Sequence, residues 1–226
     1  MPSTIIRNVN RKETMLNKTQ KFWDKQAQKY DYSERQFEPV FENVILETQK
    51  YLTNEDKVLD FGCATGTKTI QLAESVQHIH GLDISSAMIK EANKKISKQN
   101  LGNIKFSQGN IFVNDYEHAS FDKIISYGVL HLLNNVDEVI RRLHNLLKPG
   151  GLFISTTACL QDKMAFKNRL EFYAYQLIKK LGFFPLHLNM FKSDNVETLI
   201  AKQGFQIVKA ETILHGITIS FIIARK

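Results

Sequence analysis

Three polar side chains follow short apolar runs of the sequence, where each could contact a ligand. Asp60 and Asp83 close two such runs, and Asn110 follows a third. A carboxylate in this position can accept both hydroxyl protons of a ribose, and an amide oxygen can accept from an adenine amino group. Two of the three residues also have a simpler interpretation, Asp83 as a helix N-cap and Asn110 as a turn residue. Their recurrence at successive run ends favours a nucleoside-binding site.

The first acid opens the small-residue turn Asp60-Phe61-Gly62-Cys63-Ala64-Thr65-Gly66. Glycine and alanine let the backbone approach a ligand closely, and the helix expected from about Lys68 offers unpaired N–H groups. A nucleoside or an amino acid fits such a turn, although many α/β proteins have one. A nicotinamide-dependent dehydrogenase is the main rival. Its three-glycine fingerprint becomes Gly62, Ala64 and Thr67 here, which fails at two of three positions.

The elements that must position these residues alternate between strands and helices. Strands are predicted at 57–61, 78–82, 104–108, 123–127 and 152–156, and apolar residues at helical spacing lie between them. One such helix follows caps at Ser85 and Ser86, and another ends at Pro149-Gly150-Gly151. A helix at 194–202 precedes a hairpin formed by 205–214 and 217–225. We predict an α/β, Rossmann-like, doubly wound fold whose mainly parallel seven-stranded sheet is closed by an antiparallel C-terminal β-hairpin.

Two segments lie outside this alternation. Trp23, Ala27 and Tyr30 share a helical face near the start, and a second apolar helical stripe contains Phe166, Leu170, Tyr173, Leu177 and Leu181. Both segments could pack into the core, or they could cover the crevice at the carboxyl ends of the strands. We predict one domain, 1–226, with 1–55 as an N-terminal helical lid and 157–192 as a helical insertion over the active site.

Composition narrows the function classes. The chain has 226 residues, 43% of them hydrophobic, and only two cysteines, which argues against a disulfide framework and excludes a zinc site made of thiolates alone. No apolar run is long enough to span a membrane, and the polar, basic N-terminus lacks a signal peptide, so a cytoplasmic protein is expected. The net charge is +7, but basic residues are scattered in pairs on helical patterns, so nucleic acid is not expected as a partner.

Taken together, the motifs resemble the class I S-adenosylmethionine-dependent methyltransferase family, in the small-molecule branch that includes the ubiquinone and menaquinone ring methyltransferases. The similarity also covers Phe22 to Lys25, Tyr30-Asp31, Leu130-His131 and Leu147 to Gly151. It implies S-adenosyl-L-methionine as cofactor and S-adenosyl-L-homocysteine as product. The family turn usually has glycine in place of Ala64, and an acid in place of Asn110.

The resemblance also implies a role for each matching residue. The methionine portion would lie against the turn glycines and Ala64, the ribose on Asp83, and the adenine between Ile84 and the edge formed by Asn110 and Ile111. The Ser126 carbonyl region would meet the amino group, and Tyr30 would reach the carboxylate. The full set of cofactor-binding residues is Tyr30, Asp60, Gly62, Ala64, Gly66, Asp83, Ile84, Met88, Asn110, Ile111 and Ser126.

Methyl transfer mainly requires a nucleophile aligned with the methyl group at roughly 3 Å. Where a base is needed, His131 is the first catalytic candidate and Tyr127 the second, although His131 could simply position or pack. Ser126-Tyr127-Gly128-Val129 replaces the motif of nucleic-acid amino methyltransferases, no Pro-Cys pair is present, and no acidic cluster suited to magnesium is evident. We therefore predict a metal-independent enzyme for a small organic acceptor. The aromatic side chains in 157–192 suggest an apolar or aromatic one.

Two alternatives stay open at this stage. One is a protein that binds S-adenosylmethionine or S-adenosylhomocysteine without transferring a methyl group. The other is a methyltransferase acting on RNA or protein, which strong salt-dependent RNA affinity would support.

Overall fold

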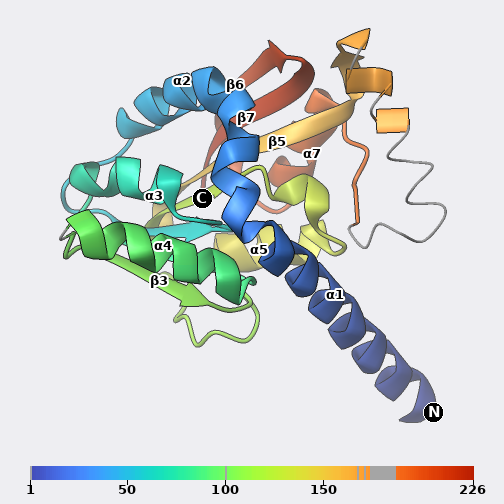
Figure 1. The fold of residues 1–226 in the computed structure, drawn as a ribbon. Helices are drawn as coiled ribbons and strands as arrows, with labels where there is room; N and C mark the ends of the chain where they lie inside the picture. Colours follow the sequence, from blue (N-terminus) through green and yellow to red (C-terminus); the bar gives the residue numbers. More distant parts are fainter. Residues whose placement is uncertain (1, 100, 167, 171, 174–186) are drawn as a thin grey trace.

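A seven-stranded sheet in the order β3-β2-β1-β4-β5-β7-β6 forms the centre of the computed structural model, which describes residues 2–99, 101–166, 168–170, 172–173 and 187–226 (Figure 1). Strands β1 to β5 pair in parallel, and β7 pairs antiparallel with both β5 and β6. The predicted fold class is confirmed. The strands are β1 (Lys57–Phe61), β2 (His78–Asp83), β3 (Ile104–Gln108), β4 (Phe121–Tyr127), β5 (Leu147–Met164), β6 (Gln206–His215) and β7 (Ile217–Arg225).

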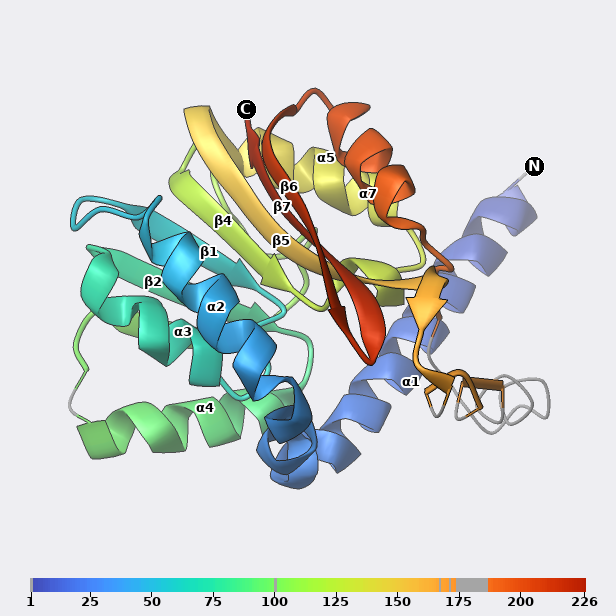
Figure 2. The same cartoon turned by 90° about the horizontal axis from the view of Figure 1, so that it is seen from above.

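Helices cover both faces of the sheet, which is why its central strands are almost continuously apolar. Figure 2 shows α2, α3 and α4 on one side of the sheet and α5 and α7 on the other. Each side has its own buried cluster, with Val44 and Ile89 in the first and Ile140 and Ile200 in the second. The helices are α1 (Pro2–Glu34), α2 (Glu38–Gln49), α3 (Thr67–Leu72), α4 (Ser86–Gln99), α5 (Val136–Leu146) and α7 (Ser193–Ala201), with the 3₁₀ turns η1 (Arg35–Phe37), η2 (Ala73–Ser75) and η3 (Leu130–Leu132).

The register of the parallel strands brings the polar strand ends to one edge of the sheet. Asp60 pairs with Gly81 on the neighbouring strand, and Asp83 pairs with Gln108. The helix after Asp83 begins as expected, because Ser85 Oγ accepts the backbone N–H of Met88 at 3.1 Å and so caps α4. The acids singled out from the sequence therefore share one rim.

Strand β5 corrects two predicted boundaries. It continues to Met164, well past the expected end at 156, because β7 offers it hydrogen-bond partners from Leu152 opposite Arg225 to Cys159 opposite Thr218. It also begins directly after α5, so Pro149-Gly150-Gly151 lies in the strand and does not end the helix. Residues 157–164 of the predicted helical insertion are consequently strand.

The apolar helical stripe predicted beyond this strand is only partly described. Phe166, Leu170 and Tyr173 are in helical backbone, and their side chains are exposed by 73%, 63% and 63%. Core packing is therefore the wrong interpretation for these three residues. Leu177 and Leu181 lie outside the described residues.

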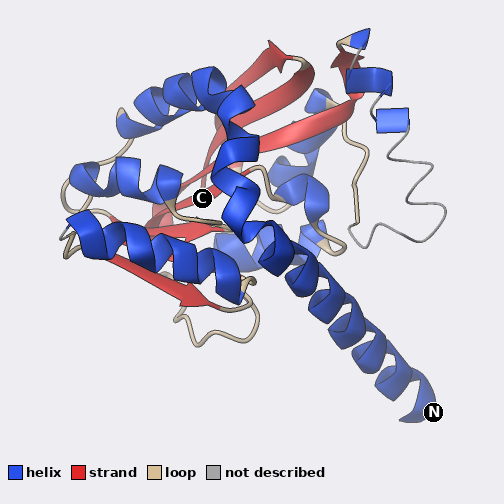
Figure 3. Cartoon of the chain, in the orientation of Figure 1, coloured by secondary structure: helices blue, strands red, loops and turns tan. Residues whose placement is uncertain are grey.

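The N-terminal segment forms two helices with different surroundings. Helix α2 packs Val40, Val44 and Ile45 into the core. Helix α1 runs past the N-terminal end of α4 and buries Ala27, and its own N-terminal part extends away from the body of the protein (Figure 1 and Figure 3). None of the helices that the described residues form has the length and apolar character to cross a bilayer.

Candidate functional site

The turn after β1 has an unusual backbone. Gly62, Ala64 and Gly66 have φ angles of 80°, 48° and 74°. The N–H groups of Gly62 and Cys63 both donate to the carbonyl of Leu82, at 2.8 and 3.2 Å, which fastens the turn to β2. Ala64 is left-handed, a conformation that glycine adopts at lower cost, which agrees with the glycine that the resemblance implies at this position. The alanine keeps the turn geometry at some cost in strain.

Asp83 connects the turn to the next strand end. Its Oδ2 accepts the N–H of Ala64 at 3.0 Å, and its Oδ1 accepts that of Ser85 at 2.8 Å. Asp60 lies deeper, where its Oδ2 accepts the hydroxyl of Thr69 at 2.5 Å. Burial disfavours both charged carboxylates and raises the pKa of each to about 6. Hydrogen bonds to Thr69 and to the backbone oppose this effect.

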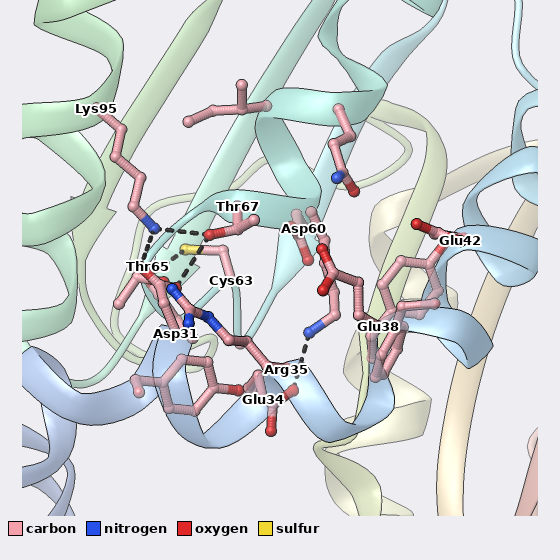
Figure 4. Close-up of a pocket in the computed structure, with 18 residues that line it drawn as sticks. Asp31, Glu34, Arg35, Glu38, Glu42, Asp60, Cys63, Thr65, Thr67 and Lys95 are labelled. Atoms are coloured by element: carbon pink, nitrogen blue, oxygen red, sulfur yellow. Dashed lines mark hydrogen bonds and ion pairs between the residues drawn. The ribbon is translucent and has the colours of Figure 1, made fainter. Parts of the chain in front are cut away.

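A first cavity of about 450 Å³ opens between this turn, the end of α1 and helix α3 (Figure 4). Of the predicted site residues, it brings together Tyr30, Asp60, Gly62, Ala64 and Tyr127. Its other lining residues are mostly charged or polar. They are Asp31, Glu34, Arg35, Glu38, Phe41, Glu42, Cys63, Thr65, Thr67, Lys68, Ile70, Gln71 and Lys95.

The predicted adenine-side residues lie on the same rim but do not line this cavity. Asn110 acts as the turn residue of the simpler interpretation, because its Oδ1 accepts the N–H of Phe112 at 3.0 Å. The Ile84 carbonyl accepts from Gln108 Nε2 at 3.2 Å. The side chains of Met88, Ile111 and Ser126 are buried, and Gly66 forms the left-handed N-cap of α3.

A second cavity of about 560 Å³ adjoins the first and is largely apolar. Six aromatic side chains other than the tyrosine of β4 contribute to its lining, and His131 lies in its wall. Among the lining residues that the structure describes, Glu34 is the one carboxylate, and lysine and arginine are absent. The aromatic set is Phe22, Trp23, Tyr30, Phe37, Phe41 and Phe172.

The two cavities share four lining residues, Tyr30, Glu34, Phe41 and Tyr127. Burial raises the pKa of Tyr30 well above its ordinary value, and the neighbouring carboxylates, Glu34 first among them, add to the effect. Tyr30 therefore keeps its proton and can act as a hydrogen-bond donor at the junction.

Tyr127 is held from the opposite side of the junction. Its hydroxyl forms a 2.5 Å hydrogen bond with the hydroxyl of Thr48, and its ring lies 5.9 Å from that of Phe41. Burial raises the pKa of this phenol far above its ordinary value. Tyr127 thus keeps its proton, and its hydroxyl is already bonded to Thr48.

His131 lies in η3, directly beyond β4. Its carbonyl accepts the N–H of Asn189 at 2.7 Å, which fixes the backbone of the turn. Its Nδ1 atom is buried and has no hydrogen-bond partner within the described part of the chain. Burial lowers the pKa of the imidazole to about 4, so the side chain is neutral near pH 7 and has a lone pair to offer.

Sequence reasoning missed the acidic face of α1. Asp24, Asp31 and Glu34 are spaced by seven and three residues, and each contacts the rim of the site. Their spacing is enough to put the three acids on one face of a helix. Nothing in the sequence showed that this face would meet the turn after β1, because the contact joins segments more than thirty residues apart.

The fold and the strand-end site together define the class of Rossmann-like methyltransferase domains. A family model described as a methyltransferase domain matches residues 52–208, well over half of the chain, and the chain belongs to this family. The resemblance found in the sequence is thereby confirmed.

Individual relatives agree with this assignment. A demethylmenaquinone methyltransferase of Lactococcus lactis is 34% identical over 131 residues, 55% of this chain and 51% of that protein. A phosphoethanolamine N-methyltransferase of Plasmodium falciparum is 29% identical over 76% of this chain and 66% of its own length. The chain thus spans about half the length of the Lactococcus enzyme.

Solved structures show the same fold. A phosphoethanolamine N-methyltransferase 2 of Haemonchus contortus superposes with a TM-score of 0.68 at 15% identity, over 82% of this chain and 53% of that one. The YcgJ protein of Bacillus subtilis gives a TM-score of 0.66 at 15% identity, over 82% of this chain and 98% of its own. At these identities the likeness concerns the fold alone.

Proposed function

We propose that this chain transfers the methyl group of S-adenosylmethionine to a small organic acceptor. The observation that carries the proposal is the junction of two cavities. One is bounded by the turn after β1 and by carboxylates, the other by aromatic side chains, and they meet at Tyr30 and Tyr127. A donor in the first cavity and an acceptor in the second would face each other across this junction.

The residues of the first cavity and its rim suit the proposed cofactor. N–H bonds from Ala64 and Ser85 hold the Asp83 carboxylate in place, and the roughly four lone pairs of a carboxylate leave room for ribose hydroxyl donors. Five carboxylates line the cavity against three cations, and this excess favours a cationic ligand group. The carboxylates are Asp31, Glu34, Glu38, Glu42 and Asp60, and the cations are Arg35, Lys68 and Lys95. Bound S-adenosylmethionine would supply a methyl group activated by a positively charged sulfur.

Adenine recognition rests on residues that line neither cavity. We propose that Ile84 packs on the ring and that Asn110 and Ile111 read its edge, as the resemblance implies. The side-chain oxygen of Asn110 accepts the N–H of Phe112 and keeps a second lone pair for the adenine amino group, whereas the backbone N–H of Asn110 already donates to Asn114 Oδ1 at 3.1 Å.

The second cavity, called the acceptor cavity below, suits an uncharged, apolar or aromatic acceptor. Its aromatic side chains offer flat apolar surface, and the ring of Trp23 lies at an angle of 76° to that of Tyr30. A phosphorylated acceptor such as the one named for the Plasmodium relative would need a cation to offset its charge. Among the described lining residues, however, Glu34 is negatively charged and would repel a phosphate group.

The chain's own residues would contribute in three ways. Tyr30 would donate a hydrogen bond at the junction, and His131, neutral near pH 7, would accept a proton from an acceptor that loses one. Helix α1 would act as a lid that excludes water from the junction, and Asn168 and Phe172, which follow β5, would close the acceptor side of the second cavity.

Calorimetry with S-adenosylmethionine and S-adenosylhomocysteine, followed by turnover assays on matched acceptor pairs, tests the proposal. We expect binding of both nucleosides, and turnover of a neutral phenol or quinol but not of its phosphorylated counterpart. Binding without turnover on a broad panel would favour a non-catalytic binding protein. If neither nucleoside binds, the proposed function is wrong.

A further inference from the structure

Asp31, near the end of α1, reaches into the turn after β1. Its Oδ1 accepts the hydroxyls of Thr65 at 2.5 Å and Thr67 at 3.1 Å. Its Oδ2 lies 2.7 Å from Lys95 Nζ, and this ammonium also donates to Thr67 Oγ1 at 2.6 Å. Figure 4 shows these residues converging at one end of the first cavity. One carboxylate thus joins α1 to the turn and to helix α4.

Two further acids of α1 repeat this pattern on either side. Asp24 Oδ1 accepts from Ser85 Oγ at 2.6 Å and from the N–H of Ala87 at 3.1 Å, at the start of α4. Glu34 Oε2 lies 3.0 Å from Lys68 Nζ, in the first turn of α3. The acidic face of α1 therefore contacts the turn after β1, the first turn of α3 and helix α4.

The adjoining face of the same helix belongs to the acceptor cavity. Trp23 lines that cavity, and Tyr30, the residue before Asp31, lines both. The position of α1 on the turn consequently fixes where the aromatic wall stands relative to the cofactor turn. Since Thr65 is almost fully buried while the Asp31 side chain is 50% exposed, Asp31 is the accessible end of this link.

We propose that Asp31 is a positioning residue, which holds helix α1 on the Thr65 hydroxyl and thereby completes the cofactor site and the junction wall together. The inference rests on the proposed function, in which helix α1 is the lid, because the hydrogen bond between Asp31 and Thr65 would hold that helix in place. Exposed ion pairs contribute little to stability, so the bond to the buried hydroxyl should carry the coupling.

A double-mutant cycle on affinity for S-adenosylhomocysteine tests the link. We expect Asp31→Ala and Thr65→Val each to weaken binding about tenfold, and the double variant to bind about as weakly as either one, since both remove the same bond. Asp31→Asn, which keeps an acceptor oxygen for Thr65, should restore part of the loss. A hundredfold loss in the double variant would show that the two residues act independently, and would overturn the proposal.

The protein without ligand provides a second measurement. Trp23 is the single tryptophan of the chain and lies on α1, so its fluorescence reports the position of that helix. We expect Asp31→Ala and Thr65→Val to increase acrylamide quenching of Trp23 by about twofold, with circular dichroism melting curves close to that of the unaltered protein. Glu91→Gln, which removes a surface ion pair with Lys94 on α4, is the matched control and should leave quenching and affinity unchanged.

The outcomes separate this inference from the function on which it rests. If the unaltered protein binds neither nucleoside, the proposed function fails, and quenching of Trp23 still decides whether Asp31 holds α1. If the protein binds both nucleosides, but Asp31→Ala leaves affinity and quenching unchanged, the positioning role is wrong and the function stands. Should Asp31→Ala fail to fold, Thr65→Val alone carries both measurements.

Discussion

Asp83 accepts the backbone N–H of Ala64 across 3.0 Å, and this bond joins the turn after β1 to the end of β2. Asp83 is the acid predicted to bind the ribose. Ala64 is the residue at which the turn departs from the glycine expected from the resemblance. Because the left-handed backbone of Ala64 directs its N–H at the carboxylate, the strained alanine and the acid depend on each other.

Asp83→Ala should weaken binding of S-adenosylhomocysteine at least a hundredfold. The change removes the acceptor proposed for the ribose hydroxyls and leaves the Ala64 N–H without its partner, and losses from buried polar groups of this kind reach several kcal/mol. Isothermal titration calorimetry measures the effect. Asp115→Asn, at an exposed position outside both cavities, is the control and should bind normally. Unaltered affinity in Asp83→Ala would remove this residue from the cofactor site.

The pH dependence of binding should follow Asp60 and Asp83, whose pKa values burial raises to about 6. A carboxylate with a raised pKa keeps its proton in the folded protein after the unfolded chain has lost it, so ligand-free stability should fall as pH rises from about 4 to about 6. Binding of S-adenosylmethionine should instead strengthen as pH rises through 6, because the ionised carboxylates attract its sulfonium.

The measurement is a series of titrations and melting curves between about pH 4 and about pH 8 at constant ionic strength, in steps on the order of half a pH unit. Asp60→Asn should flatten part of both profiles. An affinity for S-adenosylmethionine that stays constant across pH 6 would contradict the inference about these two carboxylates. A stability that rises between pH 4 and pH 6, equally in the unaltered protein and in Asp60→Asn, would also contradict it.

His131→Asn should lower turnover by roughly two to four powers of ten, the usual contribution of a general base, with little change in cofactor affinity. Tyr127→Phe should leave turnover within about threefold, since its hydroxyl is bound to Thr48 and keeps its proton; its main effect should be a loss of roughly 1 kcal/mol of stability. Initial rates and melting curves of the two variants give the comparison. The reverse ranking of rates would assign the base to Tyr127.

Ala64→Gly should raise stability by about 1 kcal/mol, because the φ of 48° at this residue suits glycine and strains alanine. Chemical denaturation measures the difference, and affinity for S-adenosylhomocysteine should not fall. A clear loss of stability would mean that the methyl group of Ala64 makes contacts worth more than the strain it causes.

Gly81→Ala should destabilise the protein by roughly 1 to 3 kcal/mol, the usual cost of overpacking. A Cβ at this position would lie 2.4 Å from Cδ1 of Phe106 and 2.9 Å from Sγ of Cys63, so the core beneath the turn would have to shift. Gly102→Ala is the matched control, because an added Cβ there meets no heavy atom within 4 Å. Equal melting temperatures for the two variants would contradict this account.

The sequence alone determined the order of the strands and helices, the closing hairpin and the rim on which Asp60 and Asp83 lie. These features follow from local patterns: apolar runs of strand length, the helical spacing of crossover residues, and turns rich in small residues. Parallel pairing then brings successive strand ends to one edge whatever the details of packing. The end of β5 escaped this reasoning, because a strand stops where its partner stops, and the partner β7 lies some sixty residues further along the chain.

Tertiary structure alone decided how the candidate site is divided into two cavities and how strongly its side chains are desolvated. Tyr30 and Tyr127 are 97 residues apart in the sequence, and both line the two cavities. Burial, which depends on the whole packed protein, leaves His131 neutral and keeps the proton on Tyr127. The contact of Asp31 with Thr65 likewise exists only because α1 crosses the rim. Residue types and spacing encode local conformation, whereas desolvation and long-range contacts arise only when the chain is folded.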